Sequence, residues 1–404
     1  MIEKFIRQEY IDKLLEYRWS PLIKVLTGMR RSGKTEILKQ FLEYIKKQYK
    51  IKNNQILYIN MEYIDFDNIK NYQDLSKHIN DNIWEDNLKL LIIDEIQEIS
   101  WREKYINNLL AKYGSNIQIY ISGSNSNLLS SDLATYITGR YIQIYIYPLS
   151  MSEYTSSINK KLDKNSLDAY MQNGWLPGTL FFGDNYENIN SYNRSVLDSI
   201  TLKDMVRYYN LRNLSFFEDL IKFIFVNIGN VFSAKSISDY LKSQKIKANV
   251  ETIMDYLSYC VHSNILHQVK TSDIQSKKTF DIYNKYYVND LWLRNGLVSW
   301  NFARDIWWWL ENLIYLELIK SCYNVYIWRI WGFEIDFIAS KNNKTIYIQA
   351  CYKFEWQKTL DREYRGLQMI SDNWPKYIVT YEEQNLWVID GINSICVTDI
   401  YDIL

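Results

Sequence analysis

The first third of the chain alternates short apolar runs with longer segments of helical spacing. The apolar runs are typical of strands buried on both faces of a sheet, and they cover residues 22–26, 55–60, 89–94, 117–122 and 141–147. Between them, apolar residues recur three or four positions apart, which predicts helices over 36–50, 72–84 and 101–113. Strands and helices in alternation predict an α/β fold, a parallel sheet with helices on both faces.

The pattern changes after Pro148. Helical spacing up to residue 215, interrupted at 174–178, indicates a small helical lid. Residues 216–290 predict a winged-helix module of three helices and a hairpin, with strands at 265–269 and 278–283. A second α/β unit follows, with a helix at 306–322 and strands at 325–329, 334–339 and 345–352. We therefore expect four parts, namely 1–148, 149–215, 216–290 and 291–404.

One loop of this pattern carries recognisable chemistry. It reads GMRRSGKT and fits G-x-x-x-x-G-K-[ST] between the first strand and the first helix. There, backbone N–H groups and the positive helix end point at phosphate oxygens. Lys34 would reach the outer phosphates of a nucleotide, and the Thr35 hydroxyl would ligate Mg²⁺. The predicted nucleotide-binding residues are Gly28, Met29, Arg30, Arg31, Ser32, Gly33, Lys34, Thr35 and Glu36.

Two acids at the end of the third apolar run complete this chemistry. Ligands of parallel sheets gather at the carboxyl ends of strands, so Asp94 and Glu95 can share a crevice with the loop. Asp94 is placed to hold Mg²⁺ through water, and Glu95 to polarise the attacking water. Neither a Gly-rich turn before a helix nor a strand that ends in two acids indicates a nucleotide site by itself. Together, in this order, they predict a nucleotide hydrolase.

Composition narrows the class of protein. The 404 residues suffice for two or three domains, and 47% of them are apolar, which argues against disorder. Lys and Arg (47) balance Asp and Glu (47), so no overall field attracts nucleic acid or a membrane surface. The four cysteines form no C-x-x-C pair, which is typical of reduced thiols. With no apolar run of membrane-spanning length and no signal-peptide pattern, we expect a cytoplasmic protein without membrane contact.

Further motifs follow in a fixed order along almost the whole chain. Besides the loop they are 93–98 (IDEIQE), 121–125 (ISGSN), 133–141 (LATYITGRY), 147–150 (YPLS), 285–290 (KYYVND), 310–313 (LENL) and 334–337 (EIDF). On these segments the chain resembles the prokaryotic AAA+-type ATPases that join a phosphate-loop domain to a C-terminal domain of uncertain function related to the PD-(D/E)xK restriction-endonuclease fold. The resemblance implies ATP hydrolysis with Mg²⁺. It departs at 290–295, where Trp292 stands in place of a small residue.

The resemblance implies two further site residues. A polar sensor at the end of the fourth strand is carried onto Ser124 or Asn125, where it would orient the water or touch the outer phosphate. Arg140, after Gly139, matches an arginine finger that would complete the site of a neighbouring subunit in a homo-oligomer. The alternative for Arg140 is an ordinary surface or strand-edge arginine that pairs with a carboxylate.

A nuclease of the restriction type needs a helix Glu, an Asp and a Glu-x-Lys on the next strand. Glu311 or Glu317 could supply the first and Asp336 the second. However, Gln349 is neutral at the position of the strand carboxylate, and Cys351 occupies the position of the lysine. We expect a retained fold without nuclease activity. In the structural alternative, the helix acid and Asp336 pair with residue 329, an arginine, or with a backbone amide.

DNA binding through the winged-helix module is a weaker prediction. Residues 233–280 contain seven Lys and four acids, a net charge of plus three, which is modest for neutralising phosphates. The third helix carries Glu251 and Asp255 and no Arg, and we expect its apolar residues, Met254 among them, to be core. We therefore predict an ATPase that acts as a nucleotide-driven switch or motor on an unknown target. The alternative is an ATP-gated protein that binds or processes nucleic acid.

Overall fold

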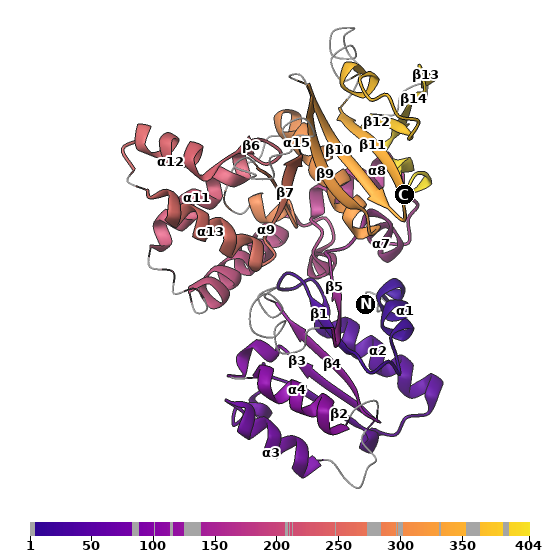
Figure 1. Ribbon diagram of the computed structural model, residues 1–404, viewed down its shortest axis with the longest axis vertical. Coiled ribbons are helices and arrows are strands. Elements are labelled where there is room, and N and C mark those ends of the chain that lie inside the picture. Colours follow the sequence, from indigo (N-terminus) through magenta and orange to yellow (C-terminus); the bar gives the residue numbers. More distant parts are fainter. Residues whose placement is uncertain are drawn as a thin grey trace. The chain divides into compact units, whose positions relative to one another are not determined.

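The computed structural model describes residues 5–82, 89–100, 102–113, 116–124, 139–206, 209, 211, 213–246, 248–272, 284–295, 297, 302–330, 333–352, 364–382 and 388–404. These residues fall into two compact units (Figure 1). The first unit comprises Met1–Pro148, Leu176–Phe181 and His262–Asn264. The second comprises Leu149–Trp175, Phe182–Val261 and Ile265–Leu404.

The first unit is built around a parallel sheet of five strands in the order β2-β3-β4-β1-β5 (Figure 1). Its strands are β1 (Ile23–Thr27), β2 (Ile56–Asn60), β3 (Leu90–Asp94), β4 (Gln118–Gly123) and β5 (Tyr141–Tyr145). Every residue of β1, β3 and β4 is buried, as expected of strands covered on both faces. The α/β fold with a parallel sheet, predicted from the alternating pattern, is confirmed.

Two pairs of helices cover the two faces of this sheet (Figure 1). On one face lie α1 (Gln8–Glu16) and α2 (Lys34–Tyr49), and Phe41 of α2 packs against Tyr120 of β4. On the other lie α3 (Tyr72–Asn82) and α4 (Arg102–Tyr113), and Ile106 of α4 joins the cluster of buried residues that contains Ile93. Short 3₁₀ turns follow as η1 (Asn53–Gln55), η2 (Ile64–Phe66) and η3 (Ile96–Glu98). Of these helices, the sequence pattern did not predict α1.

The second unit combines helices with a sheet of nine strands in the order β13-β14-β12-β11-β10-β9-β7-β8-β6. The helices are α7 (Met151–Ser157), α8 (Lys164–Asn173), α9 (Tyr186–Ser199), α11 (Leu214–Val226), α12 (Ala234–Ser243), α13 (Val250–His262), α14 (Trp292–Asn295) and α15 (Phe302–Lys320), with a π-helical turn η6 (Ile200–Val206) after α9. The 3₁₀ turn η5 (Pro177–Phe182), which belongs to the first unit except for Phe182, precedes α9, and η7 (Val397–Asp402) is the last helical turn.

The strands of this sheet are β6 (Val231–Phe232), β7 (Leu266–Ser272), β8 (Asn284–Val288), β9 (Asn324–Ile330), β10 (Phe333–Lys341), β11 (Lys344–Cys351), β12 (Lys376–Thr380), β13 (Val388–Ile389) and β14 (Ile392–Cys396). The hairpin strand β7 pairs in parallel with β9, at Thr271 with Ile327 and Ser272 with Trp328. Strands on both sides of residue 290 therefore share one sheet. The strand predicted at 278–283 lies outside the described residues, and β7 pairs with β8 instead.

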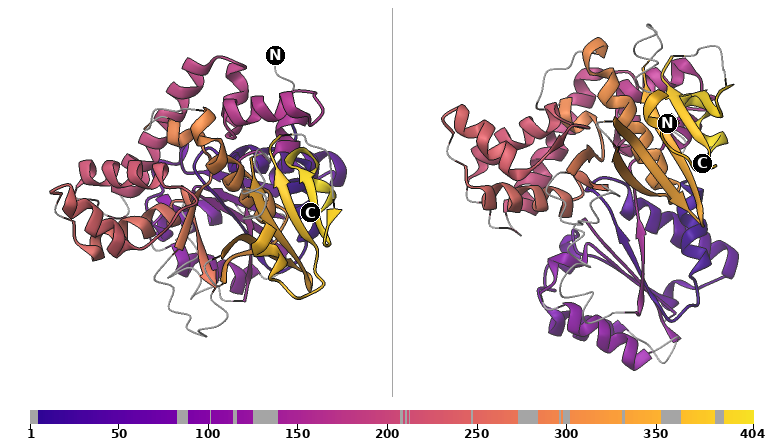
Figure 2. Two further views of the ribbon diagram at one scale, coloured as in Figure 1. Left: turned by 90° about the horizontal axis from the view of Figure 1, so that it is seen from above. Right: turned by 45° about the horizontal axis from the view of Figure 1, so that its top comes forward.

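Helix α15 lies against β9, β10 and β11 of this sheet (Figure 2). Trp309 on α15 is buried and meets the edge of Trp292, so it belongs to the core. Trp292 itself packs on Gly174, where an added Cβ would lie 3.0 Å from its ring and where φ is +82°. Its indole N–H donates to the Met171 carbonyl at 2.9 Å. A glycine on the facing segment thus accommodates the tryptophan that departs from the resembled family.

Candidate nucleotide site

Two glycines fix the shape of the loop between β1 and α2. Gly28 has φ +146°, and a Cβ there would lie 2.2 Å from the carbonyl oxygen of Ile146. Gly33 has φ +102° and stands directly before the first residue of α2. Only glycine adopts such angles freely and leaves room for this approach. The loop therefore ends at a helix N-terminus, whose N–H groups and dipole favour an anion.

Lys34 and Thr35 are the first two residues of α2 and face different neighbours. The buried Lys34 ammonium donates to the carbonyls of Gly28 at 3.0 Å and Met29 at 3.1 Å, so it lies across the loop. The Thr35 side chain lies close enough to the Asp94 carboxylate at the end of β3 to lower the pKa of that group. The two motifs that lie far apart in the sequence therefore meet at one edge of the sheet.

The Asp94 carboxylate is fully buried among hydrogen-bond donors from both neighbouring strands. On β2, Asn60 donates from Nδ2 at 2.8 Å and Tyr58 from its hydroxyl at 3.1 Å, and on β4 the Ser122 hydroxyl donates to the other oxygen. Burial raises the pKa of Asp94, although the hydrogen bonds from Ser122 and Tyr58 and the nearby Thr35 side chain oppose this rise. The sequence did not single out Tyr58, Asn60 or Ser122. Their signals were their places near the ends of β2 and β4 and, for Ser122, the motif at 121–125.

Glu95 is held from two sides. Its backbone is left-handed, with φ +56°, and its N–H donates to the Ser122 hydroxyl at 3.1 Å. Its carboxylate accepts a hydrogen bond from the side-chain amide of Gln97, and the same amide donates to the Ser124 hydroxyl at 3.3 Å. Gln97 thus links Glu95 to Ser124, the first of the two sensor candidates. Asn125 lies outside the described residues.

Three arginines surround the loop in different ways. Arg30 pairs with Glu62 at 2.5 Å, whereas Arg31 is exposed. Arg7, which the sequence did not indicate, is buried and donates from Nη1 to the carbonyls of Ser32 at 2.9 Å and Tyr147 at 3.0 Å. Arg7 therefore ties the segment before α1 to the loop and to the segment after β5.

Arg140 lies at the amino-terminal end of the parallel strands, whereas the loop lies at their carboxyl end. Its carbonyl accepts from the N–H of Ile23 at the start of β1, whereas the loop follows Thr27 at the end of that strand. Five residues of strand span about 15 Å, so the exposed Arg140 side chain does not reach the loop of its own chain. Its guanidinium donates to Asn107 on α4 at 3.1 Å.

A mostly apolar pocket of about 400 Å³ adjoins the loop at Gly33. It is lined by the segment before α1, by one side of α2 and by η5, with Phe181 exposed by 76% at its rim. Gln40 joins two of these walls, since its side chain accepts from the Arg7 N–H at 3.2 Å and donates to the Phe5 carbonyl at 2.8 Å. The pocket is of a size typical of ligand sites.

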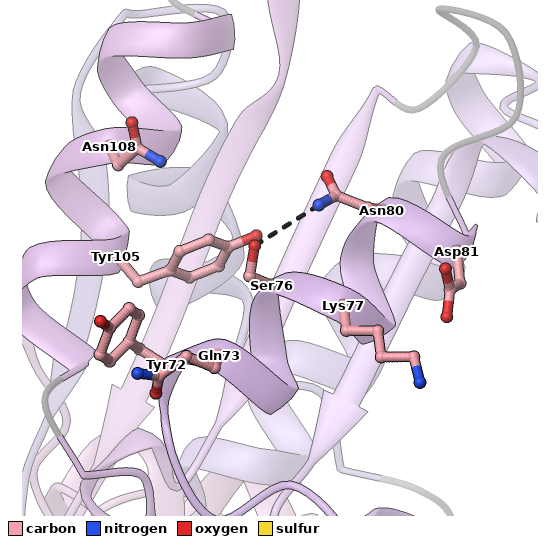
Figure 3. A pocket seen from close by; sticks show the side chains of 8 residues that line it. All are labelled: Tyr72, Gln73, Ser76, Lys77, Asn80, Asp81, Tyr105 and Asn108. Atoms are coloured by element: carbon pink, nitrogen blue, oxygen red, sulfur yellow. Dashed lines mark hydrogen bonds between the residues drawn. The ribbon is translucent and has the colours of Figure 1, made fainter.

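A larger, shallow pocket of about 610 Å³ lies between α3 and α4 (Figure 3). It is lined by Tyr72, Gln73, Ser76, Lys77, Asn80, Asp81, Tyr105 and Asn108. Lys77 and Asp81 balance in charge, so nothing in this lining favours phosphate. This pocket includes no residue of the loop.

In the second unit, Glu311, Glu334 and Asp336 surround the ammonium of Lys285, and Gln349 lines the pocket beside it. Its Nζ lies 2.7 Å from Glu311 Oε1, 2.5 Å from Glu334 Oε1 and 3.8 Å from Asp336 Oδ1, beside a pocket of about 320 Å³. Burial disfavours the charge of Lys285, but the carboxylates outweigh burial and raise its pKa. The ammonium thus lies among these three carboxylates.

These contacts decide between the alternatives for the C-terminal acids. Of the two helix acids, Glu311 faces Asp336, whereas Glu317 accepts from Tyr401 at 2.6 Å and pairs with Lys320. Asp336 Oδ2 accepts from the backbone N–H of residue 350 at 2.9 Å, as the structural alternative had it. The partner of Glu311 is instead Lys285, and the side chain of residue 329 lies outside the described part.

The helix α13 differs from the expectation at two residues, of which Val250 is only half-buried. We expected Met254 in the core, but its side chain is 58% exposed, between the exposed Glu251 and Asp255. Ile253 and Leu257 are buried as expected. The pattern was wrong for Met254 because it lies one position beyond the buried stripe of the helix.

Comparisons with known proteins agree with the fold of the first unit. Residues 20–155 match a family model described as an AAA domain, and residues 164–304 match a domain of unknown function. Together with the parallel sheet and its loop, the first match identifies residues 20–155 as an AAA domain with the fold of P-loop ATPases. An uncharacterised protein of Haemophilus influenzae is 31% identical over 402 residues, covering 97% of each chain, and this chain belongs to the same family.

Two further similarities are more distant. An uncharacterised protein of Methanocaldococcus jannaschii is 28% identical over 416 residues, covering 97% of this chain and 88% of its own. A solved Walker-type ATPase of Pyrococcus abyssi is 17% identical, with a TM-score of 0.49, and the match covers 72% of this chain and 95% of that one. In the described part of the chain, each helix is too short or too polar to cross a lipid bilayer.

Proposed function

We propose that this protein binds ATP with Mg²⁺ at the loop Gly28–Thr35, hydrolyses it, and uses the cycle as a switch or motor on a target outside this chain. The observation that carries the proposal is that the loop residue Thr35 lies beside the Asp94 carboxylate, with Glu95 next to Asp94 at the same strand end. A phosphate-binding loop, a metal-holding pair and a candidate base at one edge of a sheet are the parts that phosphoryl transfer to water requires.

The side chains at this edge suit Mg²⁺. The Thr35 hydroxyl and the Asp94 carboxylate would hold the ion, since both offer the hard oxygen donors that Mg²⁺ prefers. Among the described residues, no group of three His, Cys, Asp or Glu side chains could hold a metal by itself. Phosphate and water oxygens would therefore complete the coordination. When bound, Mg²⁺ neutralises charge on the phosphate oxygens.

The remaining roles follow from position. Lys34 would exchange its loop carbonyls for the outer phosphates. Arg31 would add positive charge at the loop, whereas Glu62 balances the charge of Arg30. Glu95 would accept the proton of the attacking water. Ser124 or Asn125 would orient that water or touch the outer phosphate.

The pocket beside Gly33 would hold the base of the nucleotide. Its walls are largely apolar, as a planar heteroaromatic ring prefers. Phe181 would stack on the base from the rim, at a position where its ring is otherwise exposed. Arg7 and Gln40 connect the segment before α1, which is one wall of this pocket, to the loop and to α2. The segments that would bind the base and the phosphates are therefore connected.

For the chain as a whole we propose four parts: the ATPase core 1–148, the lid 149–215, the winged-helix module 216–290 and a restriction-endonuclease-like domain 291–404 without nuclease activity. The Lys285 ammonium among its carboxylates supports the last point, since it stands where a catalytic metal would need those oxygens. We further propose a homo-oligomer in which Arg140 completes the neighbouring site.

ATP-gated binding or processing of nucleic acid is the second candidate. It rests on the helix-hairpin arrangement of α12, α13 and the strands β7 and β8. The exposed Glu251 and Asp255 on α13 repel phosphates, so this candidate ranks below the switch.

The test is ATP turnover by the full chain, beside its Lys34→Ala and Glu95→Gln variants. We expect Lys34→Ala to lose nucleotide binding, and Glu95→Gln to bind nucleotide but turn over at least about 100-fold more slowly. A wild-type rate no faster than that of Glu95→Gln contradicts hydrolysis. Repeating the assay with DNA over a range of salt tests the second candidate, because phosphate contacts weaken steeply with salt.

A further inference from the structure

Gln97 is the feature of the nucleotide site that the proposed roles leave unexplained. It lies in the short turn η3, two residues after Glu95, and its side chain is 7% exposed. Its amide nitrogen donates both to the Glu95 carboxylate and to the Ser124 hydroxyl. Its amide oxygen is buried without a hydrogen-bond partner.

The orientation of this amide is dictated by charge. Turning it by half a rotation would bring its oxygen against the Glu95 carboxylate, where two acceptors repel each other. The amide nitrogen therefore faces Glu95, at the cost of an unpaired buried oxygen on the other side. Hydrogen bonds to a carboxylate are among the stronger ones in proteins, so this contact fixes the direction of the Glu95 side chain.

The second contact of the amide connects Glu95 to β4. Ser124 directly follows β4 and is fully buried, and its hydroxyl lies 3.3 Å from Gln97 Nε2. A base must lie within hydrogen-bond reach of the water that it activates, and small displacements cost large factors in rate. A residue that ties the base to the neighbouring strand end thus controls the geometry of the reaction without touching the nucleotide.

We propose that Gln97 is a positioning residue for hydrolysis, which holds the Glu95 carboxylate in place and links it to Ser124. This inference rests on the proposed function, since it assigns a role within the same site. It predicts that Gln97 acts through Glu95 alone. Loss of the Gln97 amide should therefore slow turnover and leave nucleotide affinity unchanged.

The experiment is a double-mutant cycle with Gln97→Leu, Glu95→Gln and the double variant, with turnover and nucleotide Kd measured for each. We expect Gln97→Leu to lower kcat by about 10- to 100-fold, within the range for second-layer groups, with Kd within about twofold of wild type. In the Glu95→Gln background the same change should cost nothing further. Gln73→Leu, an exposed glutamine on α3, is the matched control and should leave kcat unchanged.

The outcomes separate the inference from the proposed function. If wild type hydrolyses ATP and Glu95→Gln does not, while Gln97→Leu keeps the wild-type kcat, the positioning role alone is wrong. Equal losses from Gln97→Leu in both backgrounds, or a weakened Kd, indicate a merely structural role and also overturn it. If the wild type does not hydrolyse ATP, both the proposed function and the positioning role are wrong.

Discussion

Thr35 lies beside the Asp94 carboxylate and lowers its pKa, which brings the phosphate loop to the carboxyl end of β3. The Asp94 carboxylate is fully buried, and Asn60 and Ser122 donate hydrogen bonds to it. The carboxylate is thus fixed before any ligand arrives. Preorganisation of this kind removes a reorganisation step from metal binding.

Replacing Asp94 by Asn should weaken Mg²⁺ use while preserving the fold. The amide keeps the size of the side chain, but it loses the charge that attracts the ion. We expect the Mg²⁺ concentration for half-maximal ATP turnover to rise about 10- to 100-fold. An unchanged Mg²⁺ dependence, with the unfolding transition unchanged, would contradict the role of Asp94.

Removal of the Phe181 ring should weaken nucleotide binding without affecting the chemical step. Stacking of a base on an aromatic side chain contributes about 1–3 kcal/mol, so Phe181→Ala should raise the Kd for ATP roughly 5- to 150-fold and leave kcat nearly constant. Ile64, which is 85% exposed on η2, supplies the control Ile64→Ala. Equal Kd values for the two variants would exclude Phe181 from the base pocket.

Arg140 should act on a neighbouring subunit or not at all, because it lies at the end of its own sheet opposite to the loop. We expect Arg140→Ala to lower turnover by about 1,000-fold, the lower range for an arginine finger. Mixing it with Lys34→Ala should restore activity, since one subunit then offers an intact loop and the other an intact Arg140. Full activity of Arg140→Ala alone would instead identify an ordinary surface arginine that bonds Asn107.

Lys24 makes the free energy of unfolding dependent on pH. It is fully buried in β1, donates to Gln118 and the Ser20 carbonyl, and burial lowers its pKa to about 8. Between that value and the usual 10.5, the unfolded chain binds more protons, so this group makes the fold more stable as pH rises. Below about pH 8 the buried charge lowers stability by at most about 3 kcal/mol, and by less where water screens it.

The measurement is the free energy of unfolding of wild type and of Lys24→Met from pH 7 to 10. We expect the variant to be the more stable one at pH 7, with the difference shrinking as pH rises. The double variant Lys24→Met/Gln118→Leu controls for the amide that loses its partner. A difference that is constant over this range would show that Lys24 does not titrate in the fold.

The loss of stability caused by a substitution in the Lys285 cluster should depend on which charged group is removed. Lys285→Met leaves three carboxylates unneutralised around a buried site, and breaking such a group typically costs about 3–5 kcal/mol. Glu311→Gln should cost less, because Glu334 and Asp336 still neutralise the ammonium. Urea unfolding of both variants tests this order, and we expect no Mg²⁺-dependent cleavage of DNA by the wild type.

The sequence by itself determined the parts of the site that are local. The loop Gly28–Thr35 and the strand end Asp94–Glu95 are contiguous stretches whose spacing already dictates their geometry, because a tight loop needs glycine and a buried strand needs an apolar run. The same holds for the parallel sheet, whose strands were predicted within one or two residues. Helix α1 escaped prediction because it precedes the alternating pattern.

Only the tertiary structure decided which distant side chains meet. Tyr58, Asn60 and Ser122 surround Asp94 because β2 and β4 flank β3, and the order of strands is not encoded in any local period. The choice of Glu311 over Glu317, and its pairing with Lys285, likewise depend on the packing of α15 against a sheet that continues into β7 and β8. Local spacing fixes what a segment can form, whereas contacts between segments depend on strand order and helix packing.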